Sequence, residues 1–504
     1  MELKISYKKI LDLLSQNNLL VEHNIKNPDE EIEFISDNSK NIAKNTLFFC
    51  KGLKFKEEYL VDAIKKGAVC YESEQKYDLK DYIPEIRDCN YIIVNNILRS
   101  ISLIAPLYYG YPYESFELTG ITGTKGKTTV TYFMKNIFDE YTKSKTGFNS
   151  TLETYTGNQI VESINSTPEP CDLQHFFYEA KSNGIKYFTM EVSSQAYKRD
   201  RVYGIKFNNG IFMNFAEDHI SPAEHEDIED YLNCKLEFMK NCSNIVINRE
   251  TDCFDRVLKA AQSSETLKQI TLFGSQKVKG ECDYYYSGVR RMKNKLTFYV
   301  KNDKINYCAR FAINTIGIFN VENATAAVAM GKTLGIDDES IKKGLLKTSV
   351  PGRMSIFENN GVTVIVDYAH NLLSFTKLFE SLKIDYPGRK IISVGGTPGN
   401  KALTRRKDFA NVVGRNSDYI YLTSDDPQFE DVNKICEEIA SYMPGAPFEI
   451  IADRVEAVTK AIKSAKSGDI VAVIGKGAEN YQKFMGKLVP YECDLNLAQR
   501  LLFG

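Results

Sequence analysis

The chain has no long apolar stretch, and its cysteines show none of the spacing of a metal cluster. No run of apolar residues approaches the ~18–20 that a membrane-spanning helix needs, and residues 1–16 carry charges where a signal peptide has its apolar core. We therefore expect a cytoplasmic protein without a membrane span. The 11 cysteines include no Cys-x-x-Cys pair, so we expect reduced thiols and no structural zinc.

The chain also has no excess of charge of one sign. Its 64 lysines and arginines nearly balance 66 aspartates and glutamates, and the net charge is -2. Proteins that bind duplex nucleic acid usually have a basic face or a high pI, so we expect no nucleic-acid partner. The 43% hydrophobic and 26% charged content is typical of globular proteins.

The length of 504 residues requires more than one domain, because a single core rarely exceeds ~250–300 residues. Short strands and helices alternate in residues 1–111. In residues 112–348 the alternation predicts a parallel sheet, with an antiparallel meander at 282–312. Residues 349–504 read as a second open, Rossmann-like α/β unit. We predict an α/β fold of three domains with these boundaries, in which the central domain is a phosphate-loop ATPase.

The most specific motif is a glycine-rich turn at residues 120–129, Gly-Ile-Thr-Gly-Thr-Lys-Gly-Lys-Thr-Thr, between a predicted strand and a predicted helix. Glycines let backbone N–H groups converge on phosphate oxygens at the positive end of a helix. We expect Lys127 at the β- and γ-phosphates of ATP and Thr128 at Mg²⁺. The other predicted contacts are Gly123, Thr124, Lys125, Gly126 and Thr129. Ile121 stands where the strict pattern has glycine, and a threonine-capped turn is the alternative.

Polar residues follow two further predicted strands of the central block. Glu191 ends one strand and His219 follows another, at the sheet edge where ligands of open α/β sheets bind. A carboxylate there is a natural ligand of Mg²⁺. Ser193, Arg199 and Arg201 predict contacts to an anionic substrate, since arginine pairs with carboxylate and phosphate. The alternative is a helix cap followed by solvated arginines.

Three polar clusters follow strands of the last block, and we expect them to share one crevice that holds a second substrate. They are Asp-Tyr-Ala-His at 367–370, Asp-Asp-Pro-Gln at 425–428 and Gly-Lys-Gly-Ala-Glu at 475–479.

Together these motifs resemble those of the Mur ligases of peptidoglycan synthesis. The resemblance spans nearly the whole chain. It is closest to the members that add the third stem-peptide amino acid to UDP-N-acetylmuramoyl-L-alanyl-D-glutamate. Besides the phosphate loop and the Asp-Tyr-Ala-His cluster, the motifs are Ser-Thr-Pro at 166–168, Glu-Val-Ser-Ser at 191–194, Asp-His at 218–219, Asn-Val-Glu-Asn-Ala-Thr-Ala-Ala at 320–327 and Val-Pro-Gly-Arg at 350–353.

The resemblance implies a role for each matching residue. The catalytic residues would be Lys127, Lys235, His219 and Glu191. A second Mg²⁺ would be bound by Glu191, His219 and Lys235. For this, Lys235 would be carboxylated on its amine. Further ATP contacts would be Asn323, Arg353, Asp367 and His370. The UDP-muramoyl dipeptide would meet Ser39, Ser166, Thr167, Ser193, Arg199 and Arg201. The amino acid would meet Asp425, Asp426, Pro427, Gln428, Gly475 and Glu479.

The amino acid itself is predicted from one motif. Family members that add meso-diaminopimelate carry Asp-Asn-Pro-Arg, whose arginine meets the extra carboxylate. Here the stretch reads Asp-Asp-Pro-Gln, so that carboxylate would be buried without a partner at a cost of several kcal/mol. Asp426 instead suits a terminal ammonium. We therefore predict L-lysine, with meso-diaminopimelate, ornithine or another diamine as alternatives.

The implied reaction transfers the γ-phosphate of ATP to the D-glutamyl carboxylate, and the amino acid's amine then attacks the acyl phosphate. Such a ligase would serve cell-wall synthesis, and with it cell shape and division. Three alternatives remain open at this point: a folylpolyglutamate synthetase of the same superfamily, a catalytically inactive ATP-binding regulatory protein, and a nucleic-acid motor. The Ser-Thr-Pro and Glu-Val-Ser-Ser motifs favour the muramyl substrate.

Overall fold

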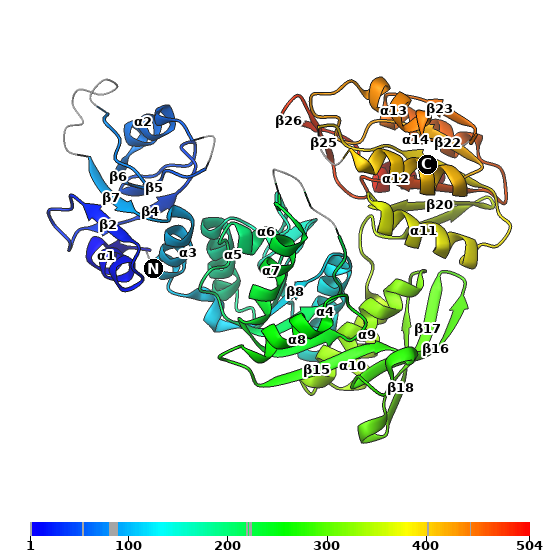
Figure 1. Cartoon of the computed structure of the whole chain (residues 1–504), viewed down its shortest axis with the longest axis horizontal. Coiled ribbons are helices and arrows are strands. Elements are labelled where there is room, and N and C mark those ends of the chain that lie inside the picture. The colour runs from blue at the N-terminus through cyan, green and yellow to red at the C-terminus, as the bar shows by residue number, and fades with distance from the viewer. Residues whose placement is uncertain are drawn as a thin grey trace.

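The computed structural model describes residues 3–52, 55–79, 89–217, 220, 224–400, 403–443 and 445–504. The chain forms three lobes (Figure 1), and the first and third lobes stand on the same side of the central one. Each lobe contains its own sheet. No helix among these residues is both long and apolar enough to cross a membrane.

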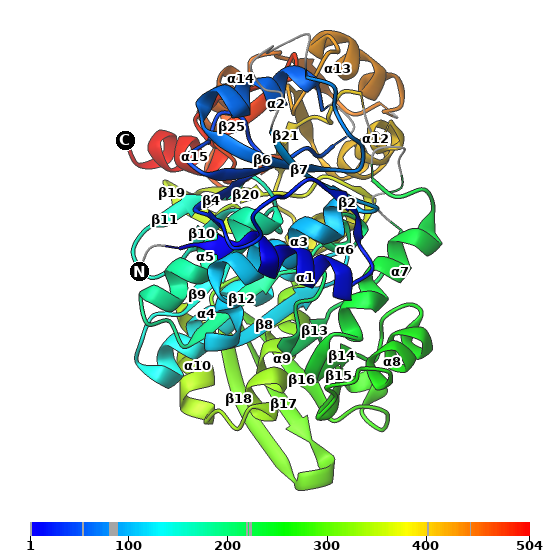
Figure 2. The same ribbon diagram turned by 90° about the vertical axis from the view of Figure 1, so that its left-hand side faces the viewer.

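The first lobe contains a five-stranded sheet with helices packed on it (Figure 2). Four strands are parallel, and the edge strand β2 pairs with β7 in the antiparallel sense. The sheet order is β2 (Leu20–His23), β7 (Asn90–Val94), β6 (Ala68–Ser73), β5 (Thr46–Phe49) and β4 (Phe34–Ser36). Separate from it, β1 (Ile5–Ser6) pairs with β3 (Glu31–Ile32), and the helices are α1 (Tyr7–Gln16), α2 (Glu57–Lys66) and α3 (Ile97–Tyr109).

The central lobe is built on an 11-stranded sheet that is parallel in its middle and antiparallel at both ends. The parallel strands, in sheet order, are β9 (Gly147–Asn149), β12 (Tyr187–Glu191), β8 (Glu117–Thr122), β13 (Phe207–Phe212), β14 (Cys242–Asn248), β15 (Gln269–Ser275) and β16 (Tyr284–Met292). The antiparallel ends are β10 (Glu153–Tyr155) with β11 (Ile160–Glu162), and β17 (Lys295–Asn302) with β18 (Tyr307–Ile313). The expected meander is confirmed, and it extends the parallel sheet through β16.

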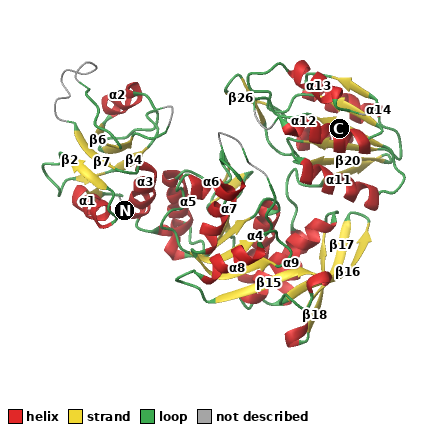
Figure 3. Cartoon of the chain, viewed as in Figure 1, coloured by secondary structure: helices red, strands yellow, loops and turns green. Residues whose placement is uncertain are grey.

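Helices cover both faces of this sheet, as the continuous apolar strands require (Figure 3). They are α4 (Lys127–Thr142), α5 (Pro170–Ser182), α6 (Ser194–Lys198), α7 (Ile228–Met239), α8 (Phe254–Gln262), α9 (Ile318–Thr333) and α10 (Asp338–Lys347). In α4, Val130, Phe133, Met134 and Ile137 recur at helical spacing and are buried in the same core as Ile121 of β8. This packing fixes the start of α4, and with it the glycine-rich turn.

The third lobe is a six-stranded sheet between helices. Its order is β19 (Ser355–Asn359), β20 (Val362–Asp367), β24 (Ile470–Ile474), β21 (Ile391–Gly395), β22 (Tyr419–Leu422) and β23 (Phe448–Ile450), parallel except for β19. The helices are α11 (Leu372–Asp385), α12 (Thr404–Asn416), α13 (Val432–Ser441), α14 (Arg454–Ser464) and α15 (Asp494–Phe503). A hairpin of β25 (Tyr481–Phe484) and β26 (Lys487–Pro490) completes it.

The sheet orders bring the predicted motifs together. In the central lobe β8 lies between β12 and β13, so the glycine-rich turn after β8 has Glu191 on one side and the end of β13 on the other. In the third lobe β20, β24, β21 and β22 are neighbours, so the three polar clusters that follow β20, β22 and β24 share one edge.

Candidate functional site

The glycine-rich turn has a backbone that only glycine fits at two positions. Gly126 precedes α4 with φ of 89°, and a Cβ there would lie 2.4 Å from Asn323 Oδ1. Gly123 has φ of 149°, and its Cβ would lie 2.8 Å from Met213 Cβ. A side chain at either position would clash with its neighbours. With glycine at both, a phosphate would meet the backbone N–H groups at the start of α4.

Asn214, which the sequence did not single out, holds this turn from the neighbouring strand. Its Oδ1 accepts from Lys125 N at 2.8 Å, and its Nδ2 donates to Lys125 O at 3.2 Å. The Thr124 N–H donates to Asn214 O at 2.9 Å. Lys127 Nζ lies over the turn and donates to Gly123 O at 2.8 Å. The position of Asn214 directly after β13 was the available signal.

Glu191 is buried at the end of β12 and contacts the first turn of α4. Thr128 Oγ1 donates to Glu191 Oε1 at 2.9 Å. Thr151, a second residue that sequence reasoning missed, donates its N–H to the same oxygen at 2.7 Å and its hydroxyl to Oε2 at 3.1 Å. A carboxylate and a hydroxyl this close are the kind of oxygen donors that Mg²⁺ prefers.

Lys235 reaches the same turn from α7. Its side chain is 1% exposed, and Nζ donates to Gly123 O at 2.9 Å and lies 4.6 Å from the centre of the Tyr231 ring. The other predicted ligand, His219, lies outside the described residues. Of the four predicted catalytic residues, the structure therefore brings Lys127, Glu191 and Lys235 together around one loop.

The residues predicted to contact the muramyl dipeptide are partly brought together. Ser166 Oγ lies 2.8 Å from Thr151 Oγ1, and Thr167 Oγ1 lies 3.3 Å from Ser193 Oγ. Arg201 Nη1 donates to Thr167 O at 2.9 Å, so these four residues form one group beside Glu191.

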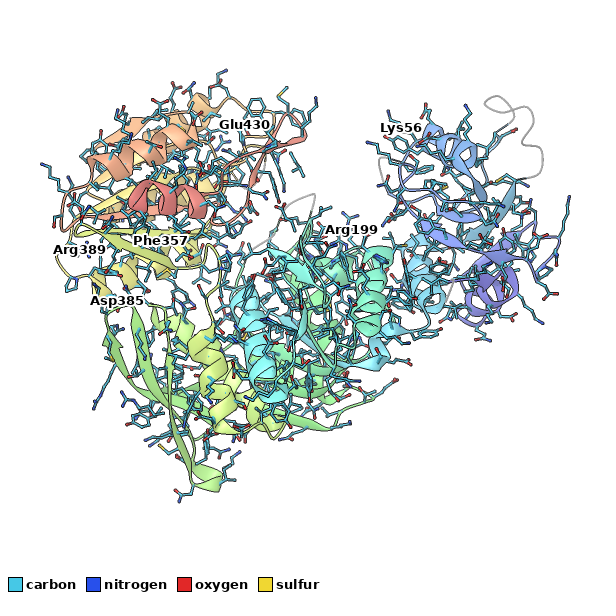
Figure 4. All side chains as sticks on the ribbon, turned by 180° about the vertical axis from the view of Figure 1, so that it is seen from behind. Lys56, Arg199, Phe357, Asp385, Arg389 and Glu430 are labelled. Carbon is cyan, nitrogen blue, oxygen red and sulfur yellow. The ribbon has the colours of Figure 1, made fainter. Side chains whose placement is uncertain are left out.

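Two of the predicted contacts stand apart from that group. Arg199 follows α6 and is exposed on the surface of the central lobe (Figure 4). Ser39 belongs to the first lobe, where its carbonyl accepts from Lys66 Nζ at 2.9 Å.

A cavity of about 260 Å³ lies over the glycine-rich turn and is closed by residues of the third lobe. Arg353 stacks on Tyr368, with Cζ 4.1 Å from the ring centre. Asp367 accepts from Met354 N at 2.7 Å and from Ala369 N at 2.8 Å, and burial raises its pKa. The predicted ATP contacts that line this cavity are Thr124, Lys125, Gly126, Lys127, Thr128, Thr129, Asn323, Arg353, Asp367 and His370.

A second cavity, of about 480 Å³, opens beside the first. Its lining includes Asp425, Asp426, Gly475 and Glu479, four of the six residues predicted to bind the amino acid. Thr124, Tyr368 and His370 line both cavities. A molecule in the second cavity would therefore meet one in the first.

Pro427 and Gln428 do not line this cavity and have a structural role instead. Gln428 N donates to Lys483 O at 2.9 Å, and Met485 N donates to Gln428 O at 2.7 Å. Gln428 has φ of 56°, a left-handed backbone that is uncommon outside glycine. This stretch anchors the β25–β26 hairpin.

Two buried cations lie behind this cavity: Lys476, which the sequence placed in a polar cluster without giving it a role, and Arg454, which the sequence did not single out. Lys476 Nζ lies 2.9 Å from Asp426 Oδ1 and 2.5 Å from Glu479 Oε2. Arg454 Nη2 pairs with Asp494 Oδ2 at 2.7 Å. Burial raises the pKa of Asp425 to about 6, although Arg454 and Lys476 oppose the shift.

A phosphate loop on a parallel sheet, facing a second α/β lobe across a shared cavity, defines a nucleotide-dependent enzyme that joins two substrates. The sequence pattern of the Mur ligase middle domain matches residues 121–331, and that of the Mur ligase glutamate ligase domain matches residues 352–477. The chain belongs to the Mur ligase family, whose members are ATP-dependent amide-bond-forming ligases.

Within the family the chain is similar to tripeptide synthetases. It is 37% identical to the UDP-N-acetylmuramyl-tripeptide synthetase of Ligilactobacillus salivarius, over 98% of each chain. It is 38% identical to the UDP-N-acetylmuramoyl-L-alanyl-D-glutamate--L-lysine ligase of Enterococcus faecalis, over 94% of this chain and 92% of that one.

Solved structures agree on the fold. A UDP-N-acetylmuramoyl-L-alanyl-D-glutamate--2,6-diaminopimelate ligase superposes with a TM-score of 0.66 at 21% identity, over 99% of both chains. A folylpolyglutamate synthase of Mycobacterium tuberculosis superposes with a TM-score of 0.62, but at 14% identity and over 80% of this chain. The folylpolyglutamate alternative therefore shares the fold, whereas the relatives of higher identity favour the muramyl ligase.

Proposed function

We propose that the chain adds L-lysine to the D-glutamyl residue of UDP-N-acetylmuramoyl-L-alanyl-D-glutamate, using ATP and Mg²⁺, as a step of peptidoglycan precursor synthesis. The observation that carries the proposal is the pair of cavities that share Thr124, Tyr368 and His370. The names of the Enterococcus faecalis relative and of a Streptococcus pneumoniae relative, 37% identical over 99% of this chain, both specify L-lysine. The cytoplasmic location stays a prediction.

The residues around the glycine-rich turn suit phosphoryl transfer. Lys127 and the N–H groups at the start of α4 would hold the triphosphate, and Thr128 with Glu191 would hold Mg²⁺. When bound, the cation offsets charge on the phosphate oxygens. The remainder of the nucleotide would be held by four residues that line the same cavity, Asn323, Arg353, Asp367 and His370. Positioning and charge compensation account for most of the catalysis in reactions of this kind.

We propose that Lys235 is carboxylated on its amine. The nitrogen is buried against a carbonyl and an aromatic ring, and burial of an ammonium is costly. Carboxylation would convert the side chain into an anion close to the phosphate loop, where it would bind a second Mg²⁺ together with Glu191 and His219.

The hydroxyl groups near Glu191 would hold the muramyl dipeptide. Ser166, Thr167 and Ser193, with Arg201, would hold the dipeptide so that its carboxylate faces the nucleotide cavity, which Ser166 and Glu191 both line. Ser39 and Arg199 would complete the site, with Ser39 near the uridine. The proposal assigns residues 1–111 to the UDP moiety, 112–348 to ATP and 349–504 to the amino acid.

The charge around the second cavity favours a cationic amino acid. Asp426 and Glu479 share Lys476, so Asp426, which the sequence predicted to suit the ammonium, already has a cationic partner. Acids nevertheless outnumber cations among the residues that line the cavity, which include one arginine, Arg405, and the acids Glu217, Glu224, Asp408, Asp425, Asp426 and Glu479. This excess of acids suits the side-chain ammonium of L-lysine and disfavours the second carboxylate of diaminopimelate.

A competition assay tests the proposal. The purified chain is given ATP, Mg²⁺, the UDP-muramoyl dipeptide and equal concentrations of L-lysine, L-ornithine and meso-diaminopimelate, and the products are separated by mass. We expect the lysine tripeptide to dominate by at least about 100-fold over the diaminopimelate product, the discrimination expected from an unpaired buried carboxylate. A dominant diaminopimelate product, or no amino-acid-dependent ATP turnover, would refute it.

A further inference from the structure

Behind the phosphate loop, the side chains of Ser194, His225 and Asp230 form a hydrogen-bonded chain, of which Ser194 and His225 are buried and Asp230 is partly exposed. His225 Nε2 lies 2.8 Å from Ser194 Oγ, and His225 Nδ1 lies 2.9 Å from Asp230 Oδ2. His225 is 1% exposed and Ser194 is 5% exposed. Ser194 and His225 line neither the nucleotide cavity nor the second cavity, so Ser194 is not placed to act as a nucleophile.

The first end of this chain belongs to the segment that follows Glu191. Ser194 is the first residue of α6, and its neighbour Ser193 caps that helix by accepting from Ala196 N at 3.2 Å. Two more contacts bind α6 to α7 and to the segment before it: Lys198 Nζ lies 3.0 Å from Asp230 Oδ2 in the first turn of α7, and Gln195 Nε2 donates to Glu224 O at 2.9 Å. The segment that carries Ser193 is thereby fixed to α7.

The second end leads to the phosphate loop. Asp230 lies in the first turn of α7, and the next residue, Tyr231, donates its hydroxyl to Thr124 Oγ1 at 3.1 Å. One turn further along, Lys235 donates to Gly123 O. The His225 ring also packs on Tyr231, with 5.2 Å between ring centres. Helices α6 and α7 lie side by side in two orthogonal views (Figures 1 and 2).

We propose that His225 is a positioning residue that couples the muramyl-binding segment to the phosphate loop through Ser194, Asp230 and α7. The inference rests on the proposed function, because it assigns the two ends to the two substrates. Both ring nitrogens are used, so one side chain fixes two helices at once. Phosphoryl transfer requires the carboxylate and the γ-phosphate in line, and a displacement of about 1 Å by a remote substitution costs about 100-fold in rate.

Substitutions of His225 distinguish a positioning role of its hydrogen bonds from simple packing of its ring. His225→Phe keeps the ring and loses both hydrogen bonds. His225→Asn retains only a group near Nδ1, and His225→Gln only one near Nε2. We expect each variant to lower kcat by about 10–100-fold and to release more than one ADP per tripeptide, while KM for ATP changes less than twofold. The matched control is His175→Phe, a half-exposed histidine on α5, which should leave kcat and the ADP-to-tripeptide ratio unchanged.

Ser194→Ala decides the matter if the His225 variants fail to fold, because it removes one hydroxyl only. The expected result is the same excess of ADP over tripeptide, with no further loss in the double variant Ser194→Ala, His225→Phe, since the residues act as one unit. An unchanged kcat and a ratio of one in Ser194→Ala would overturn the proposal.

A measurement of bound zinc is a second test of the role proposed for His225. His225, Asp230 and Cys234 offer ligand atoms within 4.8 Å of one another, so stoichiometric zinc in the purified protein would make His225 a ligand instead. If wild type and His175→Phe make no tripeptide at all, the proposed function fails rather than the role of His225.

Discussion

At the scale of single residues, the carboxyl group of Glu72 is buried with little to compensate for its loss of contact with water. It lies at 0% exposure in β6, and among the described residues neither carboxylate oxygen forms a hydrogen bond of normal geometry, although the Ser100 hydroxyl lies near enough to oppose part of the effect of burial on its pKa. Burial raises its pKa from 4.5 to about 8. The folded protein therefore holds a proton on Glu72 over a pH range in which the unfolded chain has lost it.

The stability that this proton confers should depend on pH. It is fully present below about pH 4.5 and is lost as pH rises towards 8, because the unfolded state loses its proton first. Glu72→Gln should remove this dependence and make the protein more stable than wild type at pH 8.5 by about 1–3 kcal/mol. Denaturant unfolding between pH 5 and 9 is the measurement. Parallel stability curves for the two proteins would show that Glu72 is ionised in the folded state.

Lys235 allows a sharper test at the same scale. Lys235→Ala should lower kcat by at least about 100-fold, as expected for loss of a charge that stabilises the transition state. Acetate, which supplies a small carboxylate, should restore part of the rate. The matched variant Lys235→Arg keeps a cation but cannot be carboxylated under these conditions, and should be as slow as Lys235→Ala. An active Lys235→Arg would show that a cation suffices at this position and that no carbamate is required.

At the scale of elements, much of the site follows from where strands end. Glu191 and the clusters at 367–370, 425–428 and 475–479 could be predicted because each follows an apolar strand, and parallel strands present their ends at one edge. Asn214 and Thr151 could not be predicted with the same ease, because their roles depend on which strands are neighbours. Lys476 was visible in its motif, but its pairing with Asp426, 50 residues away, belongs to the folded state alone.

At the same scale, a substitution in the glycine-rich turn tests whether the turn binds ATP. Gly126→Ala should abolish detectable ATP binding, because its Cβ would meet Asn323 Oδ1 at 2.4 Å and the backbone has φ of 89°. Gly110→Ala is the matched control: its φ is 69°, but no atom lies within 4 Å of the added Cβ. It should cost about 1 kcal/mol of stability and leave ATP binding intact. Calorimetric titration with ATP decides, and equal binding by both variants would contradict the assignment of the loop.

At the scale of the whole molecule, the third lobe rests on the hairpin of β16 and β17. Arg291 Nε lies 3.1 Å from Asp385 Oδ1, Lys293 Nζ lies 2.6 Å from Glu358 Oε2, and Tyr386 OH donates to Asn294 Oδ1 at 3.0 Å. Asp385 is at the lower edge of the third lobe, towards the central lobe (Figure 4). A cavity of about 770 Å³ lies beside these contacts, between the hairpin and the third lobe.

Charge reversal at this contact should affect the reaction, although Arg291 and Asp385 line neither the nucleotide cavity nor the second cavity. Arg291→Glu places a like charge beside Asp385 and should lower kcat by about 3–10-fold through misplacement of the third lobe. The swap Arg291→Glu, Asp385→Arg should recover most of the rate. Arg290→Glu, an exposed neighbour on the same strand, is the control. Steady-state kinetics would contradict the account if the swap were no faster than the single variant.

The central claim is that the terminal phosphate of ATP passes to the D-glutamyl carboxylate before the amide forms, and isotope transfer tests it most directly. The UDP-muramoyl dipeptide is labelled with ¹⁸O in its D-glutamyl side-chain carboxylate and is turned over with ATP and L-lysine, and the released phosphate is analysed by mass. The account predicts one labelled oxygen in each phosphate released together with tripeptide. Unlabelled phosphate formed alongside tripeptide would contradict it.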